Sequence, residues 1–145
     1  RHQTAGNLLD SLAESGATLL VRVVDALADG TARSEAQVGD VTLAPKLGLA
    51  DGEVDWTLPA EAVSAQIRGV TPEPGAFTTI DDARLKILDA TIARDVPRMP
   101  AGQFALVGRR VVVGTATDPI ELVAVHPSGR RAMDAASWWR GRPTP

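Results

Sequence analysis

Three short runs rich in branched aliphatic residues lie in the second half of the chain and constrain its fold most strongly. The runs are 103–107, 109–117 and 120–126; Gly108 and Asp118-Pro119 lie between them, and Gly114 lies within the second run. Branched aliphatic residues favour extended strands, and glycine and Asp-Pro mark turns. Alternation in the last run puts Ile120, Leu122 and Ala124 on one face and Glu121, Val123 and Val125 on the other. Two largely apolar faces predict a strand packed inside a small barrel.

Two more strands and two helices are predicted around these runs. Residues 76–80 and 84–92 are strand-like, and Asp81-Asp82-Ala83 between them predicts a hairpin turn. A helix over 59–68 carries an apolar stripe, and a short helix over 134–140 follows the last strand. Five strands with a helix at each end predict a mainly β fold with flanking helices, in the form of a small OB-like, partly open barrel.

The first thirty residues predict two successive amphipathic helices. Thr4 is the expected N-cap, Gly16 the expected break, and Asp29-Gly30 the expected end of the second helix. Two such helices cannot bury their apolar stripes against each other alone, so they need a sheet or another domain. The chain also begins with Arg1-His2 and no initiator methionine. We therefore expect the carboxy-terminal part of a longer protein, with an irregular linker that Trp56 pins to a surface.

No catalytic motif, cofactor site or metal site is predicted. The sequence has no glycine-rich phosphate loop, no His-Glu-x-x-His and no cysteine, and its two histidines, His2 and His126, stand alone. No apolar run approaches the roughly 20 residues that span a bilayer. The sequence therefore predicts a cytoplasmic protein without membrane association.

Positive charge is concentrated in the second half. Residues 1–63 carry a net charge of −6, and residues 64–145 carry +3. The basic residues that lie mostly at turns of the predicted barrel are Arg68, Lys86, Arg109, Arg110, Arg130 and Arg131. Barrels of this kind often bind nucleic acid, and with only Phe77 and Phe104 on the strands we expect contacts to phosphates rather than to bases. The alternative is ordinary solvated charge.

Several short motifs, in order along the chain, resemble methionyl-tRNA formyltransferases. They are Thr4-Ala5-Gly6, Leu27-Ala28-Asp29-Gly30-Thr31-Ala32, Ala44-Pro45-Lys46-Leu47, Val54-Asp55-Trp56, Ile67-Arg68-Gly69, Pro72-x-Pro74-Gly75-Ala76 and Gly129-Arg130-Arg131-Ala132-Met133. The resemblance implies three parts: the last helices of the formyltransferase domain (1–36), a linker (37–58) and an OB-like carboxy-terminal domain (59–145) that binds tRNA. It also implies that the catalytic residues lie upstream of Arg1.

The resemblance implies a reaction and its partners as well. The family transfers a formyl group from 10-formyltetrahydrofolate to the methionyl amino group of initiator methionyl-tRNA, and we expect this part to act as a monomer that binds tRNA without binding the folate. Lys46 matches a linker lysine near tRNA, and Arg68, Arg130 and Arg131 match basic positions of the family. With Lys86, Arg109 and Arg110 these residues form the predicted tRNA-binding set. The alternatives are a related formyltransferase acting on a sugar nucleotide or on folate, and a free-standing OB-like module.

Overall fold

The structure is a computed structural model that describes residues 3–142. Its residues form two units, one of 6–46 and one that holds 3–5 together with the chain from Leu47 onward. We call the second the barrel unit. The division falls between Lys46 and Leu47, inside the predicted linker; the predicted boundaries at 36 and 58 remain predictions. His2 lies outside the described residues.

The first unit contains a single helix where the sequence predicted two. Helix α1 runs without interruption over Ala5–Ala28, so the predicted break at Gly16 was wrong. A glycine inside a helix costs only about 1 kcal/mol relative to alanine, and good helix formers on both sides outweigh it. The predicted end was confirmed: α1 stops at Ala28 and Gly30 follows with φ of 67°. No residue of α1 is buried in the structure.

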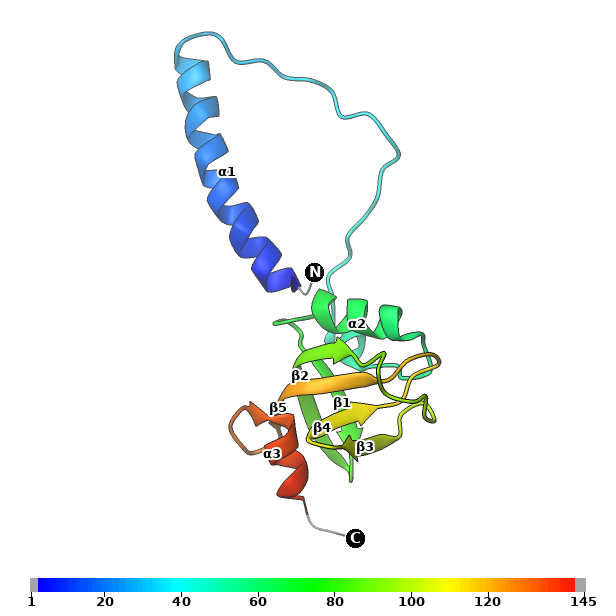
Figure 1. The fold of residues 1–145 in the computed structure, drawn as a ribbon. Helices are drawn as coiled ribbons and strands as arrows, with labels where there is room; N and C mark the ends of the chain where they lie inside the picture. The colour runs from blue at the N-terminus through cyan, green and yellow to red at the C-terminus, as the bar shows by residue number, and fades with distance from the viewer. Residues whose placement is uncertain (1–2, 143–145) are drawn as a thin grey trace. The chain divides into compact units, whose positions relative to one another are not determined.

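The barrel unit is built on a six-stranded antiparallel sheet (Figure 1). Its strands are β1 (Ala76–Ile80), β2 (Ala83–Ile92), β3 (Phe104–Val107), β4 (Arg110–Val113), β5 (Ile120–Pro127) and β6 (Met133–Asp134). The order is β1-β2-β5-β4-β3, with β6 beside β5. Among the described residues β1 and β3 do not pair with each other, so the sheet is a half-barrel, as the sequence predicted. The short β6 was not predicted.

The predicted hairpin between β1 and β2 was confirmed, with a turn of two residues, because Ala83, which was predicted to lie in the turn, already belongs to β2. Ile80 pairs with Ala83, and Asp81 and Asp82 adopt φ of 50° and 58°. Positive φ at both central positions defines the tight turn that matches the twist of two antiparallel strands, and aspartate tolerates it better than most residues. This turn fixes which residues of β2 face inward.

The alternation predicted for β5 was wrong in its second half. Ile120 and Leu122 are buried as predicted, but Val125 is fully buried too, on the side predicted for Ala124. The pairing with β2 explains the change, because the register slips on both strands near Leu88 and Val123. A bulge adds an unpaired residue and shifts the alternation by one position. Val123 is consequently exposed.

Two helices and an aromatic cluster complete the core. Helix α2 (Ala60–Gly69) begins after Pro59 and lies against β2 and β1, and helix α3 (Ala135–Arg140) packs against β5, β4 and β6. The predicted stripe of α2, Val63, Ile67 and Val70, is buried. The core is mostly aliphatic, as expected. Four of the five aromatic rings nevertheless meet in one cluster: Trp56, Phe104, Trp138 and Trp139.

The residue that follows β4, Gly114, lies so close to a neighbouring backbone segment that no side chain fits there. Strand β4 ends at Val113, earlier than predicted, and Gly114 bridges to Ala101. A Cβ on Gly114 would lie 2.0 Å from the carbonyl oxygen of Pro100 and 2.6 Å from that of Met99. Backbone atoms cannot move aside as the end of a side chain can.

Gly114→Ala should therefore lower the free energy of unfolding by about 1–3 kcal/mol, the usual cost of overpacking. The measurement is a urea titration of the barrel unit's unfolding. Gly69→Ala is the control, because a Cβ there meets no atom within 4 Å and should change stability by less than about 1 kcal/mol. Equal midpoints for the two variants would contradict the packing at Gly114.

Candidate nucleic-acid interface

The alternation of β2 places two cationic side chains on the outer face of the sheet. Leu85 and Ile87 are each 1% exposed and belong to the core. Arg84 and Lys86 alternate with them and so point to the opposite face. On the neighbouring strand His126 pairs directly with Lys86, and it too stands between two buried residues. Three basic side chains thus share one patch of the outer face.

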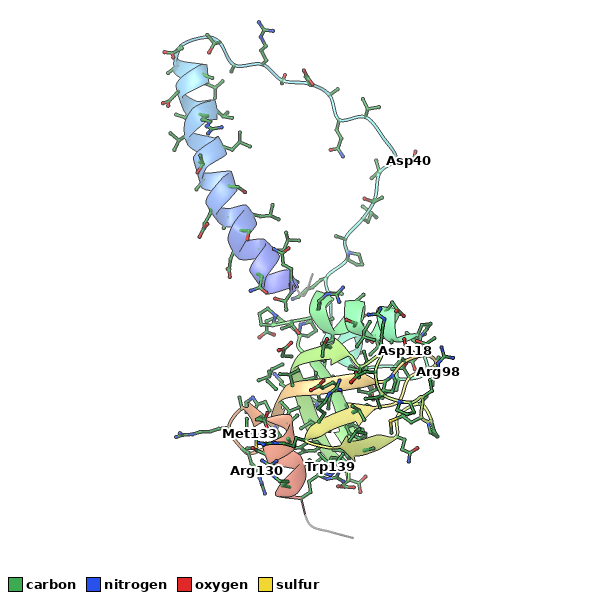
Figure 2. All side chains as sticks on the ribbon, viewed as in Figure 1. Asp40, Arg98, Asp118, Arg130, Met133 and Trp139 are labelled. Atoms are coloured by element: carbon green, nitrogen blue, oxygen red, sulfur yellow. The ribbon has the colours of Figure 1, made fainter. Side chains whose placement is uncertain are left out.

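The loop after β5 continues this patch. The loop, residues 128–132, is tied to β2 by a hydrogen bond from the Ser128 N–H to the Arg84 carbonyl oxygen, 3.1 Å long. Gly129 turns the chain with φ of 71°. Arg130 and Arg131 follow, both exposed, just before β6. Figure 2 places Arg130 near Met133 and Trp139, at the end of the barrel unit where α3 lies.

The structure therefore brings together some of the predicted set. Lys86 lies near the start of β2, and Arg130 and Arg131 lie in the loop that follows β5. Arg84, two residues before Lys86, connects the strand to this loop because its carbonyl oxygen accepts the hydrogen bond from Ser128. Arg109 is exposed in the turn between β3 and β4, on the other side of β5 in the sheet. Arg68 lies on α2 and donates a 2.7 Å hydrogen bond to the Ser64 hydroxyl. Lys46 is exposed in the first unit.

Arg110 differs from the rest of the predicted set because two carboxylates neutralise it. Its guanidinium donates hydrogen bonds of 2.6 and 3.1 Å to Asp95 and one of 2.7 Å to Glu121. The bond with Asp95 and then the bond with Glu121 raise the pKa of Arg110. The same guanidinium lowers the pKa of the Asp95 carboxyl. Arg110 thus links β4 to Glu121 of β5 and to Asp95 in the loop between β2 and β3, and the two carboxylates offset its charge.

Sequence reasoning missed three residues of this end of the barrel. Arg84 and His126 belong to the patch described above, and Arg142 lies over the Trp139 ring at 4.5 Å and pairs with Asp81 at 2.6 Å. The signal for Arg84 was available, because it alternates with two apolar residues and shares a face with Lys86. His126 could be found only through the register of β2 and β5.

Neither strand phenylalanine is free to stack on a base. Phe77 is 6% exposed, and the Arg84 guanidinium carbon covers its ring at 4.3 Å. Phe104 lies inside the aromatic cluster, against Trp56, Trp138 and Trp139. The outer face therefore offers charge rather than stacking surfaces, which is what contact with phosphates requires.

Two hollows open at this end of the barrel. One of about 260 Å³ is bordered by Arg84, Arg130 and the Arg142–Asp81 pair, and one of about 150 Å³ by Arg84, Lys86 and His126. Pockets for drug-sized ligands usually enclose about 300–1,000 Å³ and are mainly apolar. Both hollows are smaller than that. Within residues 3–142 no group of His, Cys, Asp and Glu side chains could hold a metal ion, and no helix has the length and apolarity needed to cross a membrane.

The half-barrel with its flanking helices defines an OB-like domain, and comparison with known proteins identifies its family. Residues 46–143 match the family model described as "Formyl transferase, C-terminal domain". The match covers more than half of the chain. The chain therefore belongs to the family of formyltransferase carboxy-terminal domains, as the resemblance had indicated.

The curated relatives with the most similar sequences are methionyl-tRNA formyltransferases. The protein of Clavibacter michiganensis is 54% identical over 140 residues, which cover 97% of this chain and 46% of that protein. The protein of Arthrobacter sp. FB24 is 48% identical over 139 residues, or 96% of this chain and 45% of that protein. The chain corresponds to the carboxy-terminal part of these relatives and spans about half of their length.

Solved structures share the fold at low sequence identity. HypX from Aquifex aeolicus matches with a TM-score of 0.74 at 13% identity, over 97% of this chain and 26% of that one. Another structure of HypX, in complex with tetrahydrofolic acid, matches with a TM-score of 0.63 at 15% identity, over 82% of this chain and 22% of that one. An N-formyltransferase from Helicobacter canadensis, in complex with folinic acid and dTDP-3-aminofucose, matches with a TM-score of 0.57 at 14% identity, over 83% of this chain and 45% of that one. At these identities the likeness establishes the fold alone.

The structural role of Arg110 gives a prediction about pH. In Arg110→Gln the pKa of Asp95 should rise toward its ordinary value near 3.8, because the hydrogen bonds that stabilise the carboxylate are lost. A carboxyl whose pKa is lowered by folding contributes stability above its unfolded pKa and loses it as pH falls through the folded pKa. The variant should therefore lose less stability than the wild type on acidification below pH of about 4.

An NMR titration of the Asp95 carboxyl carbon measures this change directly. Arg98→Gln is the matched control, because Arg98 pairs with Asp118 at 3.7 Å and does not contact Asp95. An Asp95 titration that stays at the wild-type pH in Arg110→Gln would show that the Arg110 hydrogen bonds do not set this pKa.

Proposed function

We propose that this chain is the tRNA-binding, carboxy-terminal part of a methionyl-tRNA formyltransferase. The whole protein would transfer a formyl group from 10-formyltetrahydrofolate to the methionyl amino group of initiator methionyl-tRNA, as a cytoplasmic monomer. One observation carries the proposal: 54% identity, over nearly the whole chain, to a protein named for that activity. In this proposal the chain supplies RNA contacts, and the preceding domain supplies the folate site and the chemistry.

The charge distribution of the barrel unit supports a role in RNA binding. Lys86, Arg130 and Arg131 gather at one end of the unit, and among the described residues none of them lies within 4.0 Å of a carboxylate. Such cations displace condensed counterions from a phosphate backbone, which makes binding favourable and sensitive to salt. Lys46, Arg68 and Arg109 add possible contacts elsewhere, while Arg110 contributes mainly through its structural role.

Helix α1 supports the assignment of the first unit to the preceding domain. Leu8, Leu12, Leu19 and Val23 recur at helical spacing, and each is between 44% and 59% exposed. A continuous apolar stripe of this length needs a partner surface. The matched relatives are about twice as long as the segment that they share with this chain, so they contain a further domain that could cover the stripe. We propose that the formyltransferase domain is that partner.

Leu12→Asp tests this assignment in the full-length protein. A carboxylate at the centre of a buried stripe is costly to desolvate, so the variant should lower the unfolding temperature of the formyltransferase domain and expose 31–46 to protease. Ser11→Asp introduces the same charge one position away, on the polar side of α1, and should behave like the wild type. Equal protease resistance of the two variants would contradict docking through this stripe.

Arg130→Ala/Arg131→Ala tests the RNA-binding role. Losing two phosphate contacts should weaken binding of initiator tRNA about tenfold or more and reduce the slope of log affinity against log salt by about two. In the formylation assay KM for tRNA should rise while kcat changes little, because the chemistry lies elsewhere. Filter binding at several salt concentrations and steady-state kinetics measure both effects.

The matched control removes two arginines from the other end of the barrel unit. The side chains of Arg94 and Arg98 are 65% and 71% exposed and pair with Glu61 and Asp118, respectively. Figure 2 labels Arg98 and Asp118. Arg94→Ala/Arg98→Ala changes the net charge equally and should leave tRNA affinity close to the wild type. If the full-length wild type formylates a sugar nucleotide and does not formylate methionyl-tRNA, the proposal is wrong, and the protein is a related formyltransferase.

A further inference from the structure

We propose that Arg84, Lys86 and His126 form a pocket for one phosphoryl group of the bound RNA backbone. The inference rests on the proposed function and deepens it, because it assigns one defined anion site within a broad basic surface. Arg84 and His126 are not part of the set that the sequence predicted. The pocket lies where β2 begins, β5 ends and the loop 128–132 follows.

The backbone places these three side chains accurately. Arg84 and Lys86 alternate along β2, and His126 stands opposite Lys86 on β5, where paired Cβ atoms are typically about 4.5–5.5 Å apart. The buried partners Leu85 and Val125 anchor the two strands from the core side. The 3.1 Å hydrogen bond from the Ser128 N–H to the Arg84 carbonyl fixes the start of the loop. The hollow between them is therefore part of the sheet rather than of a mobile surface.

The chemistry of the pocket favours an oxyanion. Its lining consists of Arg84, Lys86, His126, Pro127, Ser128 and Gly129, without an acidic residue. Among the described residues neither Arg84 nor Lys86 lies within 4.0 Å of a carboxylate. Arg84 and Lys86 carry like charges on the same face of β2 and repel each other, so this arrangement costs stability unless an anion occupies it.

The neighbouring hollow differs in this respect. There Arg142 pairs with Asp81 at 2.6 Å, and the arginine also lies over two tryptophan rings. Its charge is partly neutralised within the protein, so that hollow attracts an anion less strongly. Arg84 borders both hollows, and Arg130 borders the larger one. An RNA backbone with one phosphate in the Arg84 pocket would therefore place its neighbouring phosphates near Arg130.

Size decides which phosphoryl compound the pocket takes. At about 150 Å³ it is well below the roughly 300–1,000 Å³ of pockets that enclose drug-sized ligands. A single phosphate group with its outer oxygens in solvent suits a hollow of this size. Arginine supplies a planar fork of donors, lysine a point charge and histidine a ring N–H, which together suit the oxygens of one phosphate.

The test compares Arg84→Gln/Lys86→Gln with Arg94→Gln/Arg98→Gln in the full-length protein. Both doubles remove two positive charges, and only the first removes them from the pocket. We expect the first double variant to lower the affinity for initiator tRNA about tenfold. The slope of log affinity against log salt should fall by about one to two, which corresponds to one or two lost phosphate contacts, and the second double variant should stay near the wild type. Arg84→Lys, which keeps the charge but loses the fork, should fall between them.

A second arm uses inorganic phosphate as the probe. Line broadening in ³¹P NMR should be present with the wild type, weaker with Arg84→Gln/Lys86→Gln, and reversed by added tRNA. If wild-type protein binds tRNA and the pocket double binds it equally well, the pocket is overturned while the proposed function stands. If phosphate binds in the pocket but tRNA does not displace it, the site serves a small phosphorylated compound, and the assignment to RNA is wrong. If the wild type binds no tRNA at all, the proposed function itself fails.

Discussion

The alternation of side chains along β2 is the constraint on which both the core and the outer face depend. The two-residue turn at Asp81 and Asp82 sets the register between β1 and β2. That register sends Leu85 and Ile87 inward, where α2 buries its stripe against the sheet. A slip of one residue would bring Arg84 and Lys86 into the core and leave two charges without water. The free-energy cost of burying these two charges therefore keeps Arg84 and Lys86 on the outer face of the sheet.

The aromatic residues tie the connecting segment to the barrel. Trp56, which follows the linker, is 8% exposed and donates a 3.0 Å hydrogen bond from its indole nitrogen to the Thr78 hydroxyl. Its ring meets Phe104 of β3 edge to face, with 6.3 Å between ring centroids, and Phe104 in turn meets both tryptophans of α3. Three parts of the chain that are distant in sequence thus share one cluster. This arrangement uses the few aromatics for packing and leaves the outer face to charged groups.

Ion pairs separate the basic residues into structural and available ones. Arg94, Arg98, Arg110 and Arg142 each have a carboxylate within 4.0 Å, whereas Arg84, Lys86, Arg130 and Arg131 have none among the described residues. Exposed pairs contribute little to stability, but they neutralise the local field. These four cations lie where β2 begins and β5 ends or in the loop that follows β5, whereas other cations without a carboxylate partner within residues 3–142, such as Arg68 and Arg109, lie elsewhere in the barrel unit. A polyanion would therefore meet an attractive field at that end of the barrel unit and a balanced one around Arg98.

Local patterns in the sequence were sufficient for the five longer strands, for the stripe of α2 and for the turn between β1 and β2, because alternation and turn chemistry act between near neighbours. They also identified Lys86, Arg130 and Arg131 as basic residues of the barrel unit. The continuity of α1 through Gly16, the bulge that buries Val125 and the neutralisation of Arg110 depended on the whole helix or on contacts between distant segments. The same is true of the meeting of His126 with Lys86. Strand register and long-range ion pairs are settled only when the sheet closes around its core, so the tertiary structure alone decided which cations gather and which are paired.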